Sequence, residues 1–248
     1  LNLLDERFVL VLNDTKVFPA RLYGQKDTGG KIEVLLLKQL SPSSFTCIVR
    51  GKIKDSQKLI FSANLSATLT TGIINFNLSG SELLVTIDSL GKTPLPPYIH
   101  STESEKNLRE QYQTIYAREK GSAAAPTAGL HFTPELLENL KNKDVQIEYL
   151  TLHVGLGTFK PVTEDQIKDK TLHSEEFSIP KETAEQLNLA KSKGKKIIAV
   201  GTTTCRLLES QTDESGKLKS GRGETNIFIQ PGYKFKFTDG LITNFHLP

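Results

Sequence analysis

The sequence lacks the features that would assign it to a membrane protein or a disulfide-rich secreted protein. No apolar run approaches the roughly 18 residues that a membrane helix needs, and no charged-then-apolar leader opens the chain. Its two cysteines, Cys47 and Cys205, lie far apart and match no metal spacing. We therefore expect two unpaired thiols in a reducing compartment, and we place the protein in the cytoplasm.

Several common site motifs are missing too. The segment HVGLGTFK would need glycine at position 160 to match the dinucleotide fingerprint G-x-G-x-x-G, but Lys160 stands there. Neither a Walker-type phosphate loop nor the G-x-S-x-G elbow of α/β-hydrolases occurs. The histidines have no zinc-ligand spacing such as HExxH. We expect no metal and no permanently bound cofactor.

The sequence has the composition of an ordinary globular protein. Of its 248 residues, 37% are hydrophobic and 24% are charged, which excludes a disordered chain and allows one large core or two modest ones. Lys and Arg total 31 against 28 for Asp and Glu, which gives a formal net charge of +3. A net charge this small is compatible with RNA binding but does not by itself identify an RNA-binding protein.

A β-rich stretch covers residues 22–90. Six short segments recur there between Gly, Ser and Asn residues, and their sequences are KIEVLLL, SFTCIVRG, KLIFS, SATLTTG, IINFNL and ELLVTID. Because they show no helical period, they predict a small antiparallel barrel or sandwich. The proline-rich segment at 94–97 marks the expected exit from it.

Helices and strands alternate in the rest of the chain. A buried strand is predicted at 8–12, a helix from about Ser104, and another helix after the cap signal Thr133-Pro134-Glu135. Next come a predicted strand with the sequence VQIEYLTLHV, a helix between Pro180 and Gly194, and a strand with the sequence KKIIAV. The final segment is predicted to form strands around a Pro-Gly turn. We predict a mixed α/β domain, with a largely parallel sheet, formed by residues 1–21 and 91–248. An all-β antiparallel barrel of residues 22–90 is inserted into it.

Polar loops follow four of the predicted strands. They are Asn13-Asp14-Thr15, Gly155-Leu156-Gly157-Thr158, Gly201-Thr202-Thr203-Thr204 and Asn244-Phe245-His246. In open α/β sheets, ligands bind at the carboxyl ends of the strands. We therefore expect these four loops to converge on one site.

The segment at 116–133, YAREKGSAAAPTAGLHFT, combines charged residues with a run of small ones. Because the side chains next to Arg118, Lys120 and His131 are small, we expect that a ligand can approach the backbone closely here. Alternatives stay open for each residue. The histidines could cap strands or pack in the core, Arg118 and Lys120 could be a solvated helix face, and Thr202 and Thr203 could merely cap a helix.

Long blocks of the sequence resemble one enzyme family. LNDTKVFPARLYG, PLPPYI, YQTIYAREKGSAAAPTAGLHFT, LHVGLGTFKPV, AVGTTTCRLLES and NIFIQPGYKFKFTDGLITNFHLP are similar to the signature blocks of the S-adenosylmethionine:tRNA ribosyltransferase-isomerases of the queuosine pathway. The resemblance spans nearly the whole chain. It implies a mixed α/β domain with an inserted β-barrel, S-adenosylmethionine as co-substrate, and a tRNA carrying 7-aminomethyl-7-deazaguanine at the wobble position. Epoxyqueuosine-tRNA, adenine and methionine would be the products.

The resemblance also implies roles for individual residues. One general base must remove a proton beside the sulfonium, and His131, His153 and His246 are the candidates, with Asp14 or Glu119 as a partner or substitute. Arg118 or Arg21, with Asp14, would hold the amino-acid end of the co-substrate, and Tyr98 or Phe132 would line an adenine slot. The tRNA would lie near Lys16, Arg21, Lys120 and Lys160. The other predicted substrate-binding residues are Thr127, Gly129, Gly155, Gly157, Thr158, Thr202, Thr203 and Asn244. A non-catalytic RNA-binding module and a conventional methyltransferase remain the alternatives.

Overall fold

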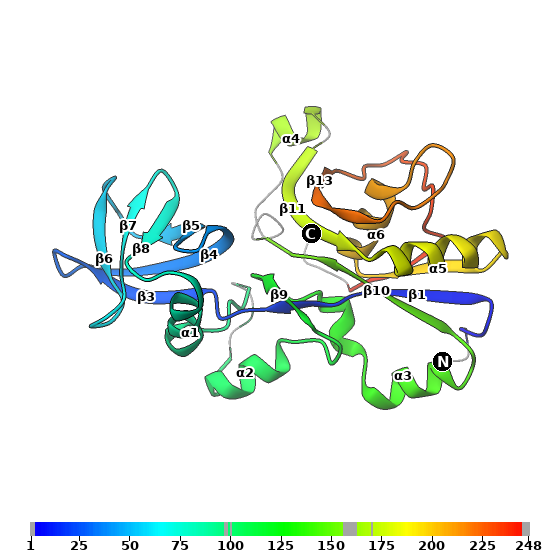
Figure 1. Ribbon diagram of the computed structural model, residues 1–248, viewed down its shortest axis with the longest axis horizontal. Coiled ribbons are helices and arrows are strands. Elements are labelled where there is room, and N and C mark those ends of the chain that lie inside the picture. Colours follow the sequence, from blue (N-terminus) through cyan, green and yellow to red (C-terminus); the bar gives the residue numbers. More distant parts are fainter. Residues whose placement is uncertain (1–2, 97–98, 100, 156–162, 170, 245–248) are drawn as a thin grey trace. The chain divides into compact units, whose positions relative to one another are not determined.

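The computed structural model describes residues 3–96, 99, 101–155, 163–169 and 171–244, and these form two compact units (Figure 1). One unit, here the α/β unit, comprises Leu1–Lys16, Gln113–Lys120 and Ala125–Pro248. The other, the barrel unit, comprises Val17–Tyr112 and Gly121–Ala124. Strands β2 (Thr15–Val17) and β9 (Glu119–Ser122) pair with each other, and the chain passes between the units within both.

Six strands of the barrel unit close into an antiparallel barrel in the order β3-β4-β5-β8-β7-β6. The strands are β3 (Arg21–Lys26), β4 (Lys31–Ser41), β5 (Ser44–Arg50), β6 (Gln57–Ile60), β7 (Ser66–Thr70) and β8 (Ile73–Phe76). Buried side chains from these strands include Leu22, Val34, Leu36, Leu59 and Ile74. The predicted inserted all-β barrel is confirmed.

The segment ELLVTID was predicted as a strand, and that prediction is wrong. It lies in helix α1 (Gly80–Leu90). Leu83 and Ile87, four residues apart, are buried, whereas Val85 between them is 70% exposed. A strand would have buried all three on one face, so the apolar spacing fits a helix. Glu82 in the first turn also favours the helix through its dipole.

The α/β unit is built on a six-stranded mixed sheet with the order β13-β11-β10-β1-β12-β14. Its strands are β1 (Phe8–Asn13), β10 (Gln146–Leu152), β11 (Thr171–Ile179), β12 (Lys196–Val200), β13 (Gly221–Ile227) and β14 (Gly240–Ile242). The neighbours β10, β1, β12 and β14 run parallel, whereas β11 and β13 are antiparallel to their neighbours. The mixed α/β fold class is therefore confirmed, and the parallel strands run from β10 to the edge strand β14.

Helices cover both faces of this sheet. Helix α3 (Pro134–Lys141) lies on one side, and α5 (Lys181–Ser192) and α6 (Thr202–Gln211) lie on the other (Figure 1). The remaining helices are α2 (Glu105–Gln111), α4 (Glu164–Asp169) and the 3₁₀ helix η1 (Thr127–His131). The cap predicted at Thr133 is confirmed, because its hydroxyl oxygen accepts the Leu136 N–H; Ser104 likewise caps the helix predicted to begin near it by accepting the Asn107 N–H.

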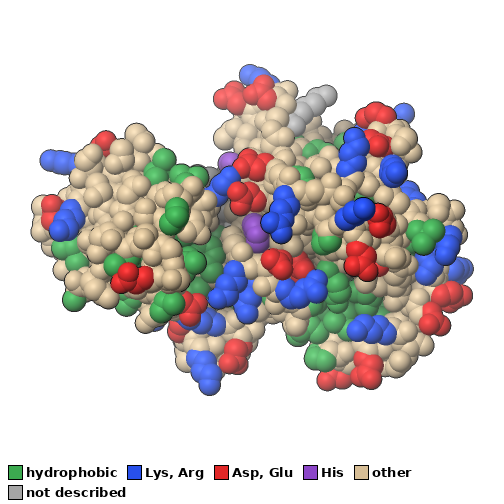
Figure 2. All heavy atoms as spheres, viewed as in Figure 1, with side chains coloured by type: hydrophobic (Ala, Val, Ile, Leu, Met, Phe, Trp, Pro, Cys, Tyr) green, Lys and Arg blue, Asp and Glu red, His purple; other side chains and the backbone are tan. Residues whose placement is uncertain are grey.

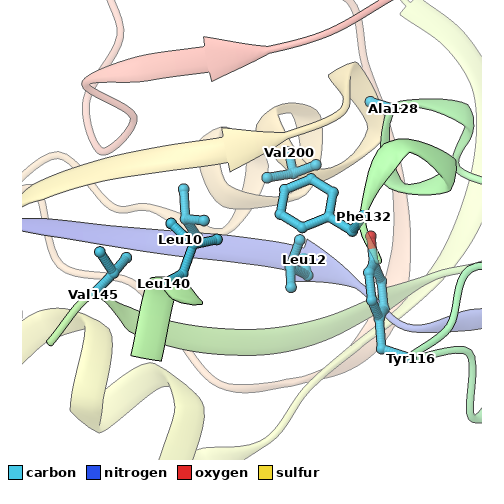
Figure 3. Packing of buried hydrophobic residues seen from close by; sticks show 8 residues of the cluster. All are labelled: Leu10, Leu12, Tyr116, Ala128, Phe132, Leu140, Val145 and Val200. Atoms are coloured by element: carbon cyan, nitrogen blue, oxygen red, sulfur yellow. The ribbon is translucent and has the colours of Figure 1, made fainter. Parts of the chain in front are cut away.

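The core beneath α3 is a cluster centred on β1. Leu10 and Leu12, both fully buried, meet Leu140, Val145 and Val200 there. Figure 3 shows the Phe132 ring between Leu12 and Val200 with the Tyr116 ring beside it; these two rings meet edge to face, 6.4 Å apart. Burying a leucine completely stabilises a fold by about 1.5–3 kcal/mol. The cluster therefore fixes η1 against the end of β1.

The segment Lys234–Phe237, predicted within the final strands, forms no strand, although the Pro-Gly turn before it is present. Its backbone N–H groups have another partner. The buried Glu209 carboxylate on α6 accepts hydrogen bonds from the N–H groups of Lys236, Phe237 and Thr238, at 2.8, 3.1 and 2.8 Å. A distant carboxylate has replaced a neighbouring strand as the acceptor, and that acceptor could not be identified from the local sequence.

Candidate functional site

The carboxyl ends of the parallel strands meet at one edge of the sheet, as the position of the polar loops predicted. Asn13, fully buried at the end of β1, joins three elements. Its side-chain amide donates to the Leu152 carbonyl of β10 at 2.9 Å and lies 3.5 Å from Thr203 Oγ1 at the start of α6. Its amide oxygen accepts the Leu152 N–H at 3.1 Å. Loops at β1, β10 and β12 therefore converge.

His153 follows β10 and contacts the loop after β1. Its Nδ1 lies 2.8 Å from the hydroxyl oxygen of Thr15, which is fully buried. Burial lowers the pKa of His153 below its ordinary value of 6.5. The imidazole is therefore neutral at physiological pH and can exchange hydrogen bonds without carrying a charge.

Asp14 and Arg118 form an ion pair at the same edge. The Asp14 carboxylate is buried and accepts from Arg118 at 2.8 and 3.1 Å and from the Thr151 hydroxyl at 2.7 Å. The Arg118 side chain is 60% exposed, and its guanidinium lies over the Tyr149 ring, 4.8 Å from the centroid. Solvent screens an exposed guanidinium, so the pair stabilises the fold by no more than about 1 kcal/mol. Its main effect is to hold a cation in one orientation.

His131 and Asn244 form a second pair at the end of β14. His131 closes η1 and is exposed, and its Nε2 lies 2.9 Å from Asn244 Oδ1. The cluster of buried side chains described above positions η1, and Asn244 follows β14 by two residues. The structure therefore brings His131 together with Asn244, a pairing that the sequence had not indicated.

The small residues at 125–129 pack closely and do not leave an open backbone surface. Ala125, Ala128 and Gly129 are buried. A Cβ atom on Gly129 would lie 2.1 Å from the Tyr116 hydroxyl oxygen, so only glycine fits there. These residues are therefore covered by protein atoms in the described part of the chain, and ligand contact along this run stays a prediction. Phe132 is likewise part of the core, and of the predicted residues in η1, Thr127 and His131 reach the surface.

The remaining predicted residues belong to several elements of the two units. Arg21 belongs to the barrel unit, where its guanidinium donates to the Leu95 carbonyl at 2.8 Å and lies 3.6 Å from Glu33. Lys120 and Thr202 are exposed, and Gly155 is partly buried. Tyr98, Gly157, Thr158, Lys160 and His246 lie outside the described residues.

Sequence reasoning missed a buried ion pair behind the loop after β10. The Glu175 carboxylate on β11 accepts the Gly155 N–H at 3.2 Å and pairs with Arg206 of α6. Both side chains are largely withdrawn from solvent. The local sequence gave no signal for this pair, because Glu175 lies in a charged stretch and its partners are distant in sequence.

The thiols of Cys47 and Cys205 are unpaired, as predicted. Both are buried, and burial raises the pKa of each to about 11. Among residues 3–96, 99, 101–155, 163–169 and 171–244, no group of three or more His, Cys, Asp and Glu side chains could hold a metal ion. Over the same ranges, none of the helices has the length and apolar character required to cross a membrane.

Comparison with known proteins gives the family. The family model described as "Queuosine biosynthesis protein" matches residues 1–248. The chain belongs to this family. An S-adenosylmethionine:tRNA ribosyltransferase-isomerase of Trichlorobacter lovleyi is 44% identical over 248 residues, covering 97% of this chain and 72% of that protein. One of Clostridium kluyveri is 48% identical over 251 residues, covering 96% and 72%. A crystal structure of S-adenosylmethionine tRNA ribosyltransferase from Thermotoga maritima, 33% identical, is matched over 100% of this chain and 70% of that one, with a TM-score of 0.46.

Proposed function

We propose that this protein transfers and isomerises the ribosyl moiety of S-adenosylmethionine onto 7-aminomethyl-7-deazaguanine at the wobble position of a tRNA. The products are epoxyqueuosine-tRNA, adenine and methionine, and the reaction takes place in the cytoplasm, where tRNA is modified. The observation that carries the proposal is the alignment of nearly the whole chain with two relatives of that name, at 44% and 48% identity.

The proposed chemistry needs a base beside a sulfonium. Sulfur carrying a positive charge withdraws electrons from the neighbouring C5′–H bond, so a positioned base can remove that proton and leave an ylide. Ring opening and loss of adenine follow, then addition of the aminomethyl nitrogen and closure to the epoxide as methionine leaves. His131 and His153 stand at the edge where the strand-end loops converge, and His246 is a third candidate.

Arg118 is suited to the carboxylate at the amino-acid end of the co-substrate. The Nε and Nη2 groups of Arg118 donate hydrogen bonds to Asp14, and the Tyr149 ring packs against one face of the guanidinium. A guanidinium that is already oriented loses little conformational entropy when it binds an anion. Because Asp14 is buried and already accepts from Arg118 and Thr151, we assign it to orienting Arg118 and not to the ammonium group. Thr127, Thr202 and Gly155 remain proposed contacts.

The tRNA needs basic side chains and space for an everted base. Figure 2 shows Lys and Arg interspersed with Asp and Glu over the visible face of the α/β unit, with no block of one sign. On this face, attraction to phosphate would come from individual basic side chains. Lys16 and Lys120, on the paired strands β2 and β9, are the proposed contacts, and binding should weaken steeply with added salt.

Release of free adenine tests the proposal. The protein is incubated with S-adenosylmethionine and a tRNA carrying the aminomethyl precursor base, and adenine and methionine are quantified. We expect both in equal amounts, and none with tRNA that lacks the precursor base. Methyl incorporation into the tRNA would indicate a methyltransferase instead. If tRNA binds and neither product appears, the protein is an RNA-binding module and the proposed function is wrong.

A further inference from the structure

We infer that His131 is the general base of the proposed reaction and that His153 is a neutral hydrogen-bond donor, with Asn244 as the residue that positions His131. This inference rests on the proposed function and assigns different roles to two histidines that sequence reasoning left equivalent. It depends on which ring nitrogen of each histidine is already engaged by the protein. A neutral imidazole carries one N–H and one lone pair, so a partner at one nitrogen decides what the other can offer.

His131 is engaged through Nε2. The partner atom, 2.9 Å away, is the side-chain oxygen of Asn244, and an amide oxygen can only accept a hydrogen bond. Nε2 must therefore carry the proton. In the neutral ring the lone pair is then on Nδ1, which has no hydrogen-bond partner in the described part of the chain. His131 is exposed at the end of η1, so this basic nitrogen can reach a bound substrate.

His153 is engaged through the opposite nitrogen. Its Nδ1 lies 2.8 Å from the Thr15 hydroxyl oxygen, and Thr15 is fully buried. Over the described ranges this is the hydroxyl's one hydrogen bond, and a buried hydroxyl that fails to donate costs about 1–3 kcal/mol. The hydroxyl must therefore donate, and Nδ1 accepts. The proton of neutral His153 is then on Nε2, which can donate to a substrate and cannot accept a proton from one.

The two histidines thus share one tautomer and present opposite atoms. In the proposed step the C5′–H bond of the sulfonium substrate breaks, its electron pair stays on carbon beside the positive sulfur, and the proton moves to His131 Nδ1. The ring then carries two N–H groups, and the Asn244 oxygen stabilises the new charge through Nε2–H. His153 Nε2–H can donate to an oxygen of the ribosyl group. The lowered pKa of His153 keeps its ring neutral, as this hydrogen-bond donor role requires.

Nitrogen NMR tests the tautomers without any reaction. Protein labelled with ¹⁵N-histidine gives distinct shifts for protonated and unprotonated ring nitrogens in a long-range proton–nitrogen correlation spectrum. We expect Nε2–H for both His131 and His153 in the wild type at neutral pH. Asn244→Asp keeps an acceptor and should keep this tautomer at His131, whereas Asn244→Ala should give a mixture. Thr15→Val should free His153 alone.

Paired substitutions test the roles, with adenine release and tRNA affinity as readouts. His131→Ala and His131→Gln should both lower adenine release by about 10²–10⁴-fold at unchanged tRNA affinity, because glutamine supplies an N–H but no basic lone pair. His153→Gln should retain clearly more activity than His153→Ala, because its amide can replace the donor. Asn244→Asp should retain more activity than Asn244→Ala.

An Nδ1–H tautomer at His131 in an active enzyme would overturn the assignment, as would a His131→Ala variant that releases adenine at the wild-type rate. Absence of adenine from the wild type would instead overturn the proposed function, and the base assignment with it. The tautomers measured by NMR separate these two failures, because they do not depend on turnover.

Discussion

Replacing Gly129 by alanine tests the packing of η1 directly. The added Cβ would lie 2.1 Å from the Tyr116 hydroxyl oxygen, 2.8 Å from Thr114 Cγ2 and 3.1 Å from Tyr116 Cζ. Carbon atoms in contact prefer about 3.5–4.0 Å, so the Tyr116 ring must shift within a close-packed cluster. Overpacking of this kind destabilises a fold by about 1–3 kcal/mol. Alanine also lowers the conformational entropy of the unfolded chain, which offsets about 0.4–1 kcal/mol of this loss. We expect the free energy of unfolding to fall by about 1–2 kcal/mol.

Urea unfolding followed by far-UV circular dichroism measures this change. Tyr116→Phe removes the closest atom, so the cost of Gly129→Ala should be lower by at least about 0.5 kcal/mol in that background. Gly155→Ala is the matched control for stability, because its Cβ would meet nothing within 4 Å. If Gly129→Ala unfolds at the same urea concentration as the wild type, or if the two substitutions show no coupling, the account of this packing is wrong.

Three further outcomes are expected. Glu209→Gln should lower the free energy of unfolding by about 1.5–3 kcal/mol in urea titrations, because an NH₂ group would then face a backbone donor; an unchanged midpoint would contradict this. Because the pKa of His153 is lowered on folding, the unfolded chain takes up the proton first, and stability should fall as the pH drops below about 6.5. Thermal unfolding of His153→Asn should show less of this acid loss. Cys47 and Cys205 should react with a thiol reagent at neutral pH only after unfolding, since burial raises the pKa of both to about 11.

The barrel strands and the cap-bounded helices could be predicted because their signals are local. Short apolar segments separated by turn residues mark β4 to β8, Thr133 caps the helix that it was expected to cap, and a helix begins next to Ser104 as expected. The segment ELLVTID failed because seven residues with mixed polarity fit either period. Only its packing, with Leu83 and Ile87 buried and Val85 exposed, distinguishes the helix from the strand.

The candidate site could be predicted in its location but not in its pairings. Parallel strands bring their carboxyl ends to one edge by geometry, so polar residues after β1, β10, β12 and β14 had to approach one another. The sequence alone did not reveal that Asn244 would meet His131, or that Glu175 would lie behind Gly155. Such partners depend on side-chain packing between segments far apart in the chain. For the same reason the sequence did not reveal that Tyr116 fills the space above Gly129.

The side-chain amide of Asn13 has a consequence for how the protein matures. Its hydrogen bonds reach residues 139 and 190 positions further along the chain. Contacts over such separations form slowly, because long loops must close before any of them can stabilise the fold. A chain still emerging during synthesis can complete its barrel, yet it cannot assemble the edge that carries His131 and His153 until β12 and the start of α6 have been made. Any chemistry at this edge therefore depends on segments that are translated long after the barrel.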